Sequence, residues 1–304
     1  MTAKRAGKRR FTAKICKASN QRILQMCELL GMSANVPTDI RFSFTGLMQR
    51  GGRTGPHRDG WGIAFYEGRG CRTFHDPRPG ADSEVARLVQ RYPIKSRNVV
   101  SHIRRASHGR VCLENTHPFV REFWGRNWSF AHNGRLRGIK KWPLAYYRPV
   151  GTTDSEHAFC WLLGKLRERY PDPPRAQRRL QQELHSLCLQ LAELGTFNIL
   201  MSDATNLFAF CTTRLCSLTR KAPFGVAKLI DAEMAVDFVE ETTPDDVVTV
   251  IATRPLTANE VWEPLPPRSL VVFRDGLRRG LITSPSRWVD SPSRSVPDPC
   301  VHYD

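Results

Sequence analysis

The chain has 304 residues, 40% of them hydrophobic and 25% charged, so it can bury a substantial core as one large domain or two small ones. Its longest apolar stretches, such as residues 159–163, are far too short to span a membrane, and no apolar segment of a secretory signal follows the basic start. Nine cysteines, an odd number without repeated close spacing, fit a cytoplasmic protein with reduced thiols better than a disulfide framework.

The formal net charge of +17 suggests a nucleic-acid partner, but its distribution weakens that interpretation. Residues 1–25 contain eight lysines and arginines and no acid, which leaves a net charge of +9 for the other 279 residues. No motif of a known nucleic-acid-binding module accompanies this charge. We therefore expect a solvated, arginine-rich surface, with neither a nucleic-acid nor a membrane partner.

Composition divides the chain into three zones. Residues 1–26 form a basic extension without sustained periodicity, which we expect to be disordered, removed or the product of a misplaced start codon. Residues 27–283 alternate apolar runs with turn signals and are predicted to form the ordered domain. Residues 284–304 are too rich in proline and serine to pack regularly, so we expect a disordered tail.

Seven short apolar segments of the middle zone are predicted as strands from their length and residue types. They are residues 61–66, 98–103, 128–132, 196–201, 207–210, 247–251 and 270–273. A first helix is predicted to begin at Thr153, whose hydroxyl can cap it. Glu156, three residues later, completes the capping-box pattern. A second helix carries leucines at 180, 184, 187, 191 and 194 on one face and should end at Gly195. Many strands with one central pair of helices predict an α+β fold.

Four segments between residues 26 and 156 carry residue types suited to attack on an amide. They are residues 26–33, which contain Cys27, followed by residues 102–109, 131–134 and 152–156. In this order and at these separations they resemble the glutaminase domain of class II glutamine amidotransferases, which is of the N-terminal-nucleophile hydrolase type. The resemblance covers about residues 26–275 and implies a four-layer αββα sandwich of that type.

Cys27 is the predicted nucleophile, because this family uses the first residue of the mature chain to attack the substrate. An isolated cysteine is more often a buried structural residue, but the three companion segments favour catalysis. As the first residue, Cys27 would have an α-amine with a pKa of about 7.7 to 8, which can serve as the base. With Met26 attached, the same nitrogen is a planar amide without a basic lone pair.

The resemblance implies roles for four further residues. Asn133 and Gly134 match the pair that holds the oxyanion, although an Asn-Gly dipeptide also favours a plain turn between strands. Arg104 matches the arginine that binds the substrate α-carboxylate, for which its planar fork is suited. Asp154 matches the acid that receives the α-ammonium, and it also has the place of an acid at a helix N-terminus.

Ser107 and His108 fall where the family places polar residues that border the substrate. The family commonly has threonine at the first of these positions, and its aminosugar-forming branch has tryptophan where Arg105 stands, so the leaving-group preference is left open. His108 could instead be the base of a papain-like pair, but nothing else in the chain resembles that family. Residues 57–59 have the sequence of a kinase catalytic triplet, but the asparagine and the phosphate-binding glycine loop of kinases are missing, so we reject that match. Residues 59–62 instead resemble a turn and strand of the amidotransferase domain.

No cofactor or metal is expected, since Cys211 and Cys216 have no second pair of zinc ligands. The expected function is hydrolysis of a γ-glutamyl amide through a thioester on Cys27, with glutamine or a γ-glutamyl conjugate as the substrate. Two alternatives are a non-catalytic γ-glutamyl-binding protein and an ammonia-donating subunit of a separate synthase. The sequence leaves open whether the protein forms a homo-oligomer. For the basic extension, we favour a start codon at Met26 over a propeptide or a retained extension.

Overall fold

The structure, a computed structural model, describes residues 26–93, 95–106 and 109–283. The predictions for residues 1–25 and for the tail from Ser284 lie outside this part of the chain, so the division into three zones stays a prediction. Within the described residues, no helix is long and apolar enough to cross a membrane.

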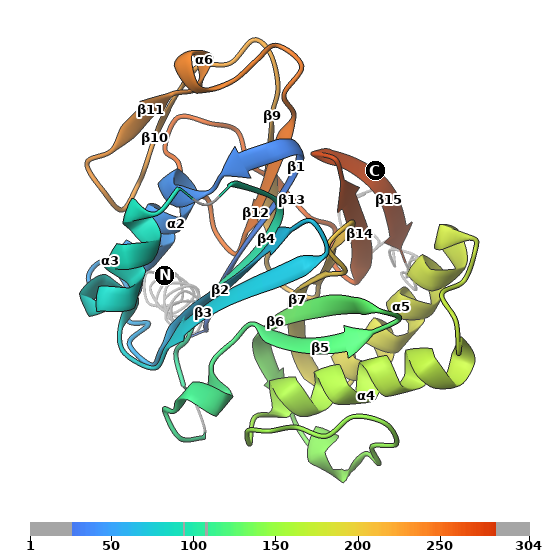
Figure 1. Cartoon of the computed structure of the whole chain (residues 1–304). Coiled ribbons are helices and arrows are strands. Elements are labelled where there is room, and N and C mark those ends of the chain that lie inside the picture. The colour runs from blue at the N-terminus through green and yellow to red at the C-terminus, as the bar shows by residue number, and fades with distance from the viewer. Residues whose placement is uncertain (1–25, 94, 107–108, 284–304) are drawn as a thin grey trace, which may run out of the picture.

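Two large antiparallel sheets form the centre of the molecule (Figure 1). The seven-stranded sheet has the order β13-β9-β12-β1-β4-β2-β3, and the six-stranded sheet has the order β15-β14-β8-β7-β6-β5. The strands of the first sheet are β1 (Glu28–Asp39), β2 (Trp61–Glu67), β3 (Gly70–Asp76), β4 (Lys95–Ile103), β9 (Cys216–Arg220), β12 (Val248–Ala252) and β13 (Glu263–Pro264). Those of the second are β5 (Phe119–Phe123), β6 (Arg126–Leu136), β7 (Gly195–Ser202), β8 (Leu207–Cys211), β14 (Ser269–Arg274) and β15 (Leu277–Thr283).

Helices cover the outer face of each sheet (Figure 1). The longer helices are α2 (Arg41–Arg50), α3 (Glu84–Arg91), α4 (Asp154–Arg169) and α5 (Gln177–Ala192). The short elements are α6 (Phe238–Glu241), the 3₁₀ turns η1 (Gly80–Asp82), η2 (Leu113–Asn115) and η3 (Ile139–Lys141), and a hairpin of β10 (Val226–Lys228) and β11 (Ala235–Asp237). The first two helices pack on the seven-stranded sheet, and α4 and α5 pack on the six-stranded sheet.

Three apolar clusters correspond to the three interfaces of this arrangement. Along β1 the side chains alternate, so that Leu29 enters the layer between the sheets while Leu30 faces the helices. Val99 and Val100 of β4 divide in the same way, because successive strand residues point to opposite faces. The expected four-layer αββα sandwich is therefore confirmed.

All seven segments predicted as strands lie in strands, with ends shifted by a few residues, and the first helix begins where predicted. Thr153 caps α4 by accepting a hydrogen bond from the Glu156 amide at 3.1 Å. The predicted end of the second helix at Gly195 was wrong, since α5 ends at Ala192. Gly195 instead begins β7, where a Cβ would lie 2.2 Å from the Arg135 carbonyl oxygen, so the glycine permits close strand packing.

Candidate active site

Cys27 lies immediately before β1, a central strand of the seven-stranded sheet. Its Sγ accepts a hydrogen bond from the Arg105 amide at 3.3 Å and donates to the Arg105 carbonyl at 3.5 Å. Although the residue as a whole is half-buried, protein atoms enclose its sulfur, and this burial raises the pKa of the thiol to about 11. The Arg105 amide and the positive charge of Arg104 oppose that rise in pKa. With Met26 attached, the thiol is therefore protonated at neutral pH.

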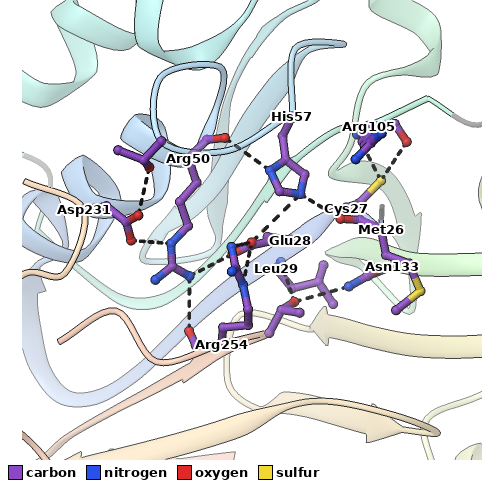
Figure 2. Close-up of polar contacts among 12 residues, drawn as sticks. Met26, Cys27, Glu28, Leu29, Arg50, His57, Arg105, Asn133, Asp231 and Arg254 are labelled. Carbon is purple, nitrogen blue, oxygen red and sulfur yellow. Dashed lines mark hydrogen bonds and ion pairs between the residues drawn. The ribbon is translucent and has the colours of Figure 1, made fainter. Parts of the chain in front are cut away.

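A buried ion-pair network fixes the residue that follows the predicted nucleophile (Figure 2). The Glu28 carboxylate binds the Arg50 guanidinium at 2.8 Å and also pairs with Arg254. Arg50, at the end of α2, in turn binds Asp231 at 2.5 Å. Because Glu28 and Arg50 are each less than 5% exposed, removal of one partner would leave an uncompensated buried charge. The network therefore holds the start of β1 in place.

Asn133 approaches the same strand from the six-stranded sheet (Figure 2). Its Nδ2 lies 3.4 Å from the Thr253 hydroxyl oxygen, which also accepts a hydrogen bond from the Leu29 amide at 2.9 Å. The Asn133 Oδ1 is buried and has no hydrogen-bond partner among the described residues. One hydroxyl thus joins the predicted oxyanion donor to the strand that begins beside Cys27.

The alternative interpretation of Asn133 and Gly134, a plain turn between strands, was wrong. Both residues lie inside β6 and pair with β7 in register with Asn198 and Phe197. Gly134 has a φ of 158°, and a Cβ there would lie only 1.9 Å from the Thr196 carbonyl oxygen. Glycine is therefore required by the close approach of the two strands.

The loop that contains Asp59 and Gly60 holds residues 104–106 in place. The Arg104 amide donates to the Gly60 carbonyl at 2.7 Å, and the Arg104 carbonyl accepts from the Asp59 amide at 3.1 Å. The Asp59 carboxylate accepts a hydrogen bond from the Ala106 amide at 2.7 Å. Arg104 is 4% exposed, and its Nη1 donates to the Arg110 carbonyl at 3.0 Å. Residues 59–60 therefore position the segment whose backbone contacts the Cys27 sulfur.

Asp154 occupies the first position of α4 and lines a cavity. Its carboxylate accepts a hydrogen bond from the Ser155 amide at 3.0 Å, as expected at a helix N-terminus, and another from the Leu136 amide at the end of β6 at 2.7 Å. It also lines a cavity of about 450 Å³ together with Gly134 and Gly109. The same acid thus secures the helix start and faces a space where a ligand can bind.

The cavity brings some of the predicted site residues together and leaves others at its edge. A Cβ on Gly109 would lie 3.6 Å from Arg104 Nη2, so the guanidinium reaches the cavity wall. Cys27 and Asn133 are not among the lining residues. Ser107 and His108 lie outside the described residues. The cavity therefore lies toward the predicted α-carboxylate and α-ammonium end of the site.

Several histidines near this site were given no role from the sequence. His57 is 1% exposed, and its Nε2 lies 2.7 Å from the Met26 carbonyl oxygen. The rings of His102 and His117 lie 4.3 Å apart, and burial lowers the pKa of both well below the usual value, so they are neutral near pH 7. Burial also lowers the pKa of His132, which contacts the Ser155 hydroxyl at 2.8 Å. No local motif identified these contacts.

Comparison with known proteins places this chain in a family. The family model for class II glutamine amidotransferases matches residues 26–297. A protein of Escherichia coli K12, provisionally named glutamine amidotransferase YafJ, is 60% identical over 253 residues, which are 83% of this chain and 99% of that protein. A protein of Haemophilus influenzae Rd with a similarly provisional name is 42% identical over 266 residues, 87% of this chain and 90% of its own. The chain belongs to the class II glutamine amidotransferases.

Solved structures agree with this assignment. A predicted glutamine amidotransferase from Pseudomonas aeruginosa PA01 superposes with a TM-score of 0.68 at 56% identity, covering 84% of this chain and 100% of that one. Glutamine phosphoribosylpyrophosphate amidotransferase from B. subtilis superposes with a TM-score of 0.54 at 14% identity, covering 84% of this chain and 49% of that one. The latter likeness concerns the fold alone. The individual roles assigned to Cys27, Arg104, Asn133, Gly134 and Asp154 stay predictions.

Proposed function

We propose that this protein is a cytoplasmic γ-glutamyl amide hydrolase whose mature chain begins at Cys27. The observation that carries the proposal is the shared Thr253 hydroxyl, which lies between the Asn133 amide and the strand that begins beside the cysteine. An amide donor next to a terminal thiol is the arrangement that acyl transfer requires, because negative charge develops on the carbonyl oxygen when sulfur attacks.

The reaction proceeds in two halves. The α-amine of Cys27 takes the thiol proton while Sγ bonds to the γ-carbonyl carbon, and Asn133 Nδ2 with the Gly134 amide stabilises the oxyanion. Collapse of this intermediate breaks the C–N bond, and the α-ammonium gives its proton to the departing amine. Water then attacks the thioester with the α-amine as base, which releases glutamate and restores the thiol.

Two observations support a chain that is processed up to Cys27. Burial raises the pKa of the Cys27 thiol to about 11, so the thiol needs a base, and with Met26 attached the adjacent nitrogen is an amide that cannot accept the proton. The family match begins at residue 26, one residue before the proposed terminus. A free α-amine, with a pKa of about 7.7 to 8, would supply the missing base at neutral pH.

The cavity supports recognition of the amino-acid end of the substrate. Arg104 is suited to bind the α-carboxylate in bidentate form, and Asp154 to accept the α-ammonium. The lining residues of the cavity include four basic side chains and a single acid, Asp154. The basic residues are Arg135, Arg137, Lys140 and Lys141. This excess of positive charge favours γ-glutamyl conjugates with additional negative charge over glutamine itself.

The test is Cys27→Ala in a chain that begins at residue 27, because this substitution keeps the α-amine and removes only the thiol. We expect glutamate release from glutamine and from a panel of γ-glutamyl conjugates to be lost, with thermal unfolding unchanged. Cys71→Ala is the matched control, since Cys71 is a half-buried cysteine on β3 and should leave turnover intact. Turnover by the Cys27→Ala protein would rule out the mechanism.

One further reading applies if the chain retains Met26. The protonated thiol and the amide nitrogen then favour a protein that binds γ-glutamyl ligands without consuming them. The intact mass of the protein isolated from its own cells separates the two readings. A mass that begins at Cys27 agrees with the hydrolase, and a mass that includes Met26, together with ligand binding but no glutamate release, agrees with the binding protein.

A further inference from the structure

The imidazole of His57 is held between two backbone carbonyl groups (Figure 2). Its Nδ1 lies 3.2 Å from the Arg50 oxygen and its Nε2 lies 2.7 Å from the Met26 oxygen. A carbonyl oxygen only accepts hydrogen bonds, whereas a neutral imidazole has a single N–H to donate. A neutral ring can therefore donate to only one of these two oxygens, and the Glu28 carboxylate also lies 3.9 Å from Nε2.

Removal of Met26 changes one side of this arrangement and leaves the other intact. In a peptide bond the carbonyl oxygen lies about 2.3 Å from the nitrogen of the next residue. Since Nε2 is 2.7 Å from that oxygen, it lies at most about 5 Å from the Cys27 nitrogen. A water at the former carbonyl position, or a small movement of the terminus, would connect the ring to the new α-amine.

We propose that His57 is a positioning residue that fixes the α-amine of Cys27 in the mature chain, an inference that rests on the proposed function. The Arg50 carbonyl keeps the proton on Nδ1, so the Nε2 lone pair accepts an N–H of the amine directly or through one water. A terminal amine otherwise rotates freely about its bond to Cα. Holding it restricts the orientations of its lone pair, which must face the thiol to act as base.

The surroundings of His57 keep the ring in this place. Arg50 makes two of these contacts: its backbone carbonyl oxygen lies within hydrogen-bond distance of His57 Nδ1, and its guanidinium binds Glu28. The ion-pair network and the imidazole are therefore held by the same residue. Besides the Glu28 carboxylate, His102 also lies close enough to interact electrostatically with the ring, and burial lowers the pKa of His102 well below its usual value, so it is neutral near pH 7. Two residues further on, Asp59 holds the Ala106 amide. One loop thus contacts the amino side of Cys27 and also the segment that touches its sulfur.

Two substitutions separate positioning from a purely structural role. His57→Asn places an amide where Nδ1 stands and keeps the contact to the Arg50 carbonyl, but it is too short to reach the terminus. His57→Gln places an amide near the position of Nε2 and can still face the amine. A structural histidine would be replaced equally well, or better, by asparagine.

The experiment measures alkylation of Cys27 by iodoacetamide from pH 6 to 9 in chains that begin at residue 27, using peptide mass spectrometry to follow this cysteine alone. We expect His57→Asn to slow alkylation near pH 7.5 by about ten- to a hundredfold, with His57→Gln within about threefold of the parent. The kcat for the best substrate should fall in the same order with KM little changed. Thermal unfolding should be similar for both variants.

The same substitutions in the 304-residue chain are the control, because an amide in place of the amine gives His57 nothing to position. Alkylation there should be slow and independent of residue 57. Equal rates for all three mature proteins would overturn the inference, as would parallel losses of rate and thermal stability in both variants. A His57 dependence of alkylation without any hydrolysis would leave the positioning role standing and reject the hydrolase function.

Discussion

The two ends of the candidate site are built in contrasting ways. Beside the predicted nucleophile Cys27, the Glu28 and Arg50 side chains are each less than 5% exposed and bound to one another. At the substrate end, Arg137, Lys140 and Lys141 are exposed around a cavity of about 450 Å³. Buried ion pairs restrict geometry, whereas exposed charges attract ligands without fixing them.

Because of this difference, the residues proposed for catalysis and those proposed to select the substrate lie in parts of the site that respond differently to substitution. The nucleophile end can be altered only at the cost of an unpaired buried charge, so it maintains one geometry. The substrate end is formed by the end of β6 and the η3 turn, where exposed side chains can change with little effect on stability. Under the proposed function, the same nucleophile end would act on several γ-glutamyl compounds.

The largest effect is expected at the buried network. Glu28→Gln should lower the free energy of unfolding by about 3 to 5 kcal/mol, because Arg50 and Arg254 lose the carboxylate that lies between them. Urea denaturation provides the measurement. Glu67→Gln is the matched control: it breaks the exposed pair with Arg72 and should cause no measurable change. Similar losses for the two proteins would mean that the network does not stabilise the nucleophile end.

The next effect tests the oxyanion position. Asn133→Ala should lower kcat by about 10²- to 10³-fold with a smaller change in KM, because the amide acts on charge that develops after substrate binding. Asn98→Ala is a close control, since Asn98 is also a buried asparagine whose Oδ1 has no partner among the described residues. Its Nδ2 donates to the Ala204 carbonyl, so its loss should lower stability and leave kcat unchanged. A fall in kcat for both variants would point to general loosening of the sheets.

The sequence predicted those features that have a local pattern. Short apolar runs identified seven strands, and Thr153 with Glu156 identified the start of α4. The Glu156 carboxylate, however, accepts hydrogen bonds from the Val150 and Gly151 amides, a contact that the capping pattern did not include. The layer order came from family resemblance, because periodicity gives the faces of a strand and not its neighbours.

Features that depend on distant contacts could not be predicted from the sequence. Glu28 meets Arg254 across 226 positions, and Arg50 meets Asp231 across 181, separations at which no spacing rule applies. His57 was considered only as part of a rejected kinase triplet, and its contact with the Met26 carbonyl appears only after folding. The residues assigned from the motifs and those found from the structure thus supply different parts of one site.

The smallest effect is expected at the positive wall of the cavity. The double variant Lys140→Gln/Lys141→Gln should raise KM for γ-glutamylglutamate by about two- to fivefold at low ionic strength, and KM for glutamine by less, because the conjugate carries more negative charge. In 0.5 M salt the difference should disappear, since exposed charges are then screened. Lys95→Gln/Lys221→Gln removes the same charge from exposed positions outside the cavity lining and should change neither KM. An equal rise in both substrates' KM with the first pair, unaffected by salt, would show that the wall shapes the cavity and does not select anionic conjugates.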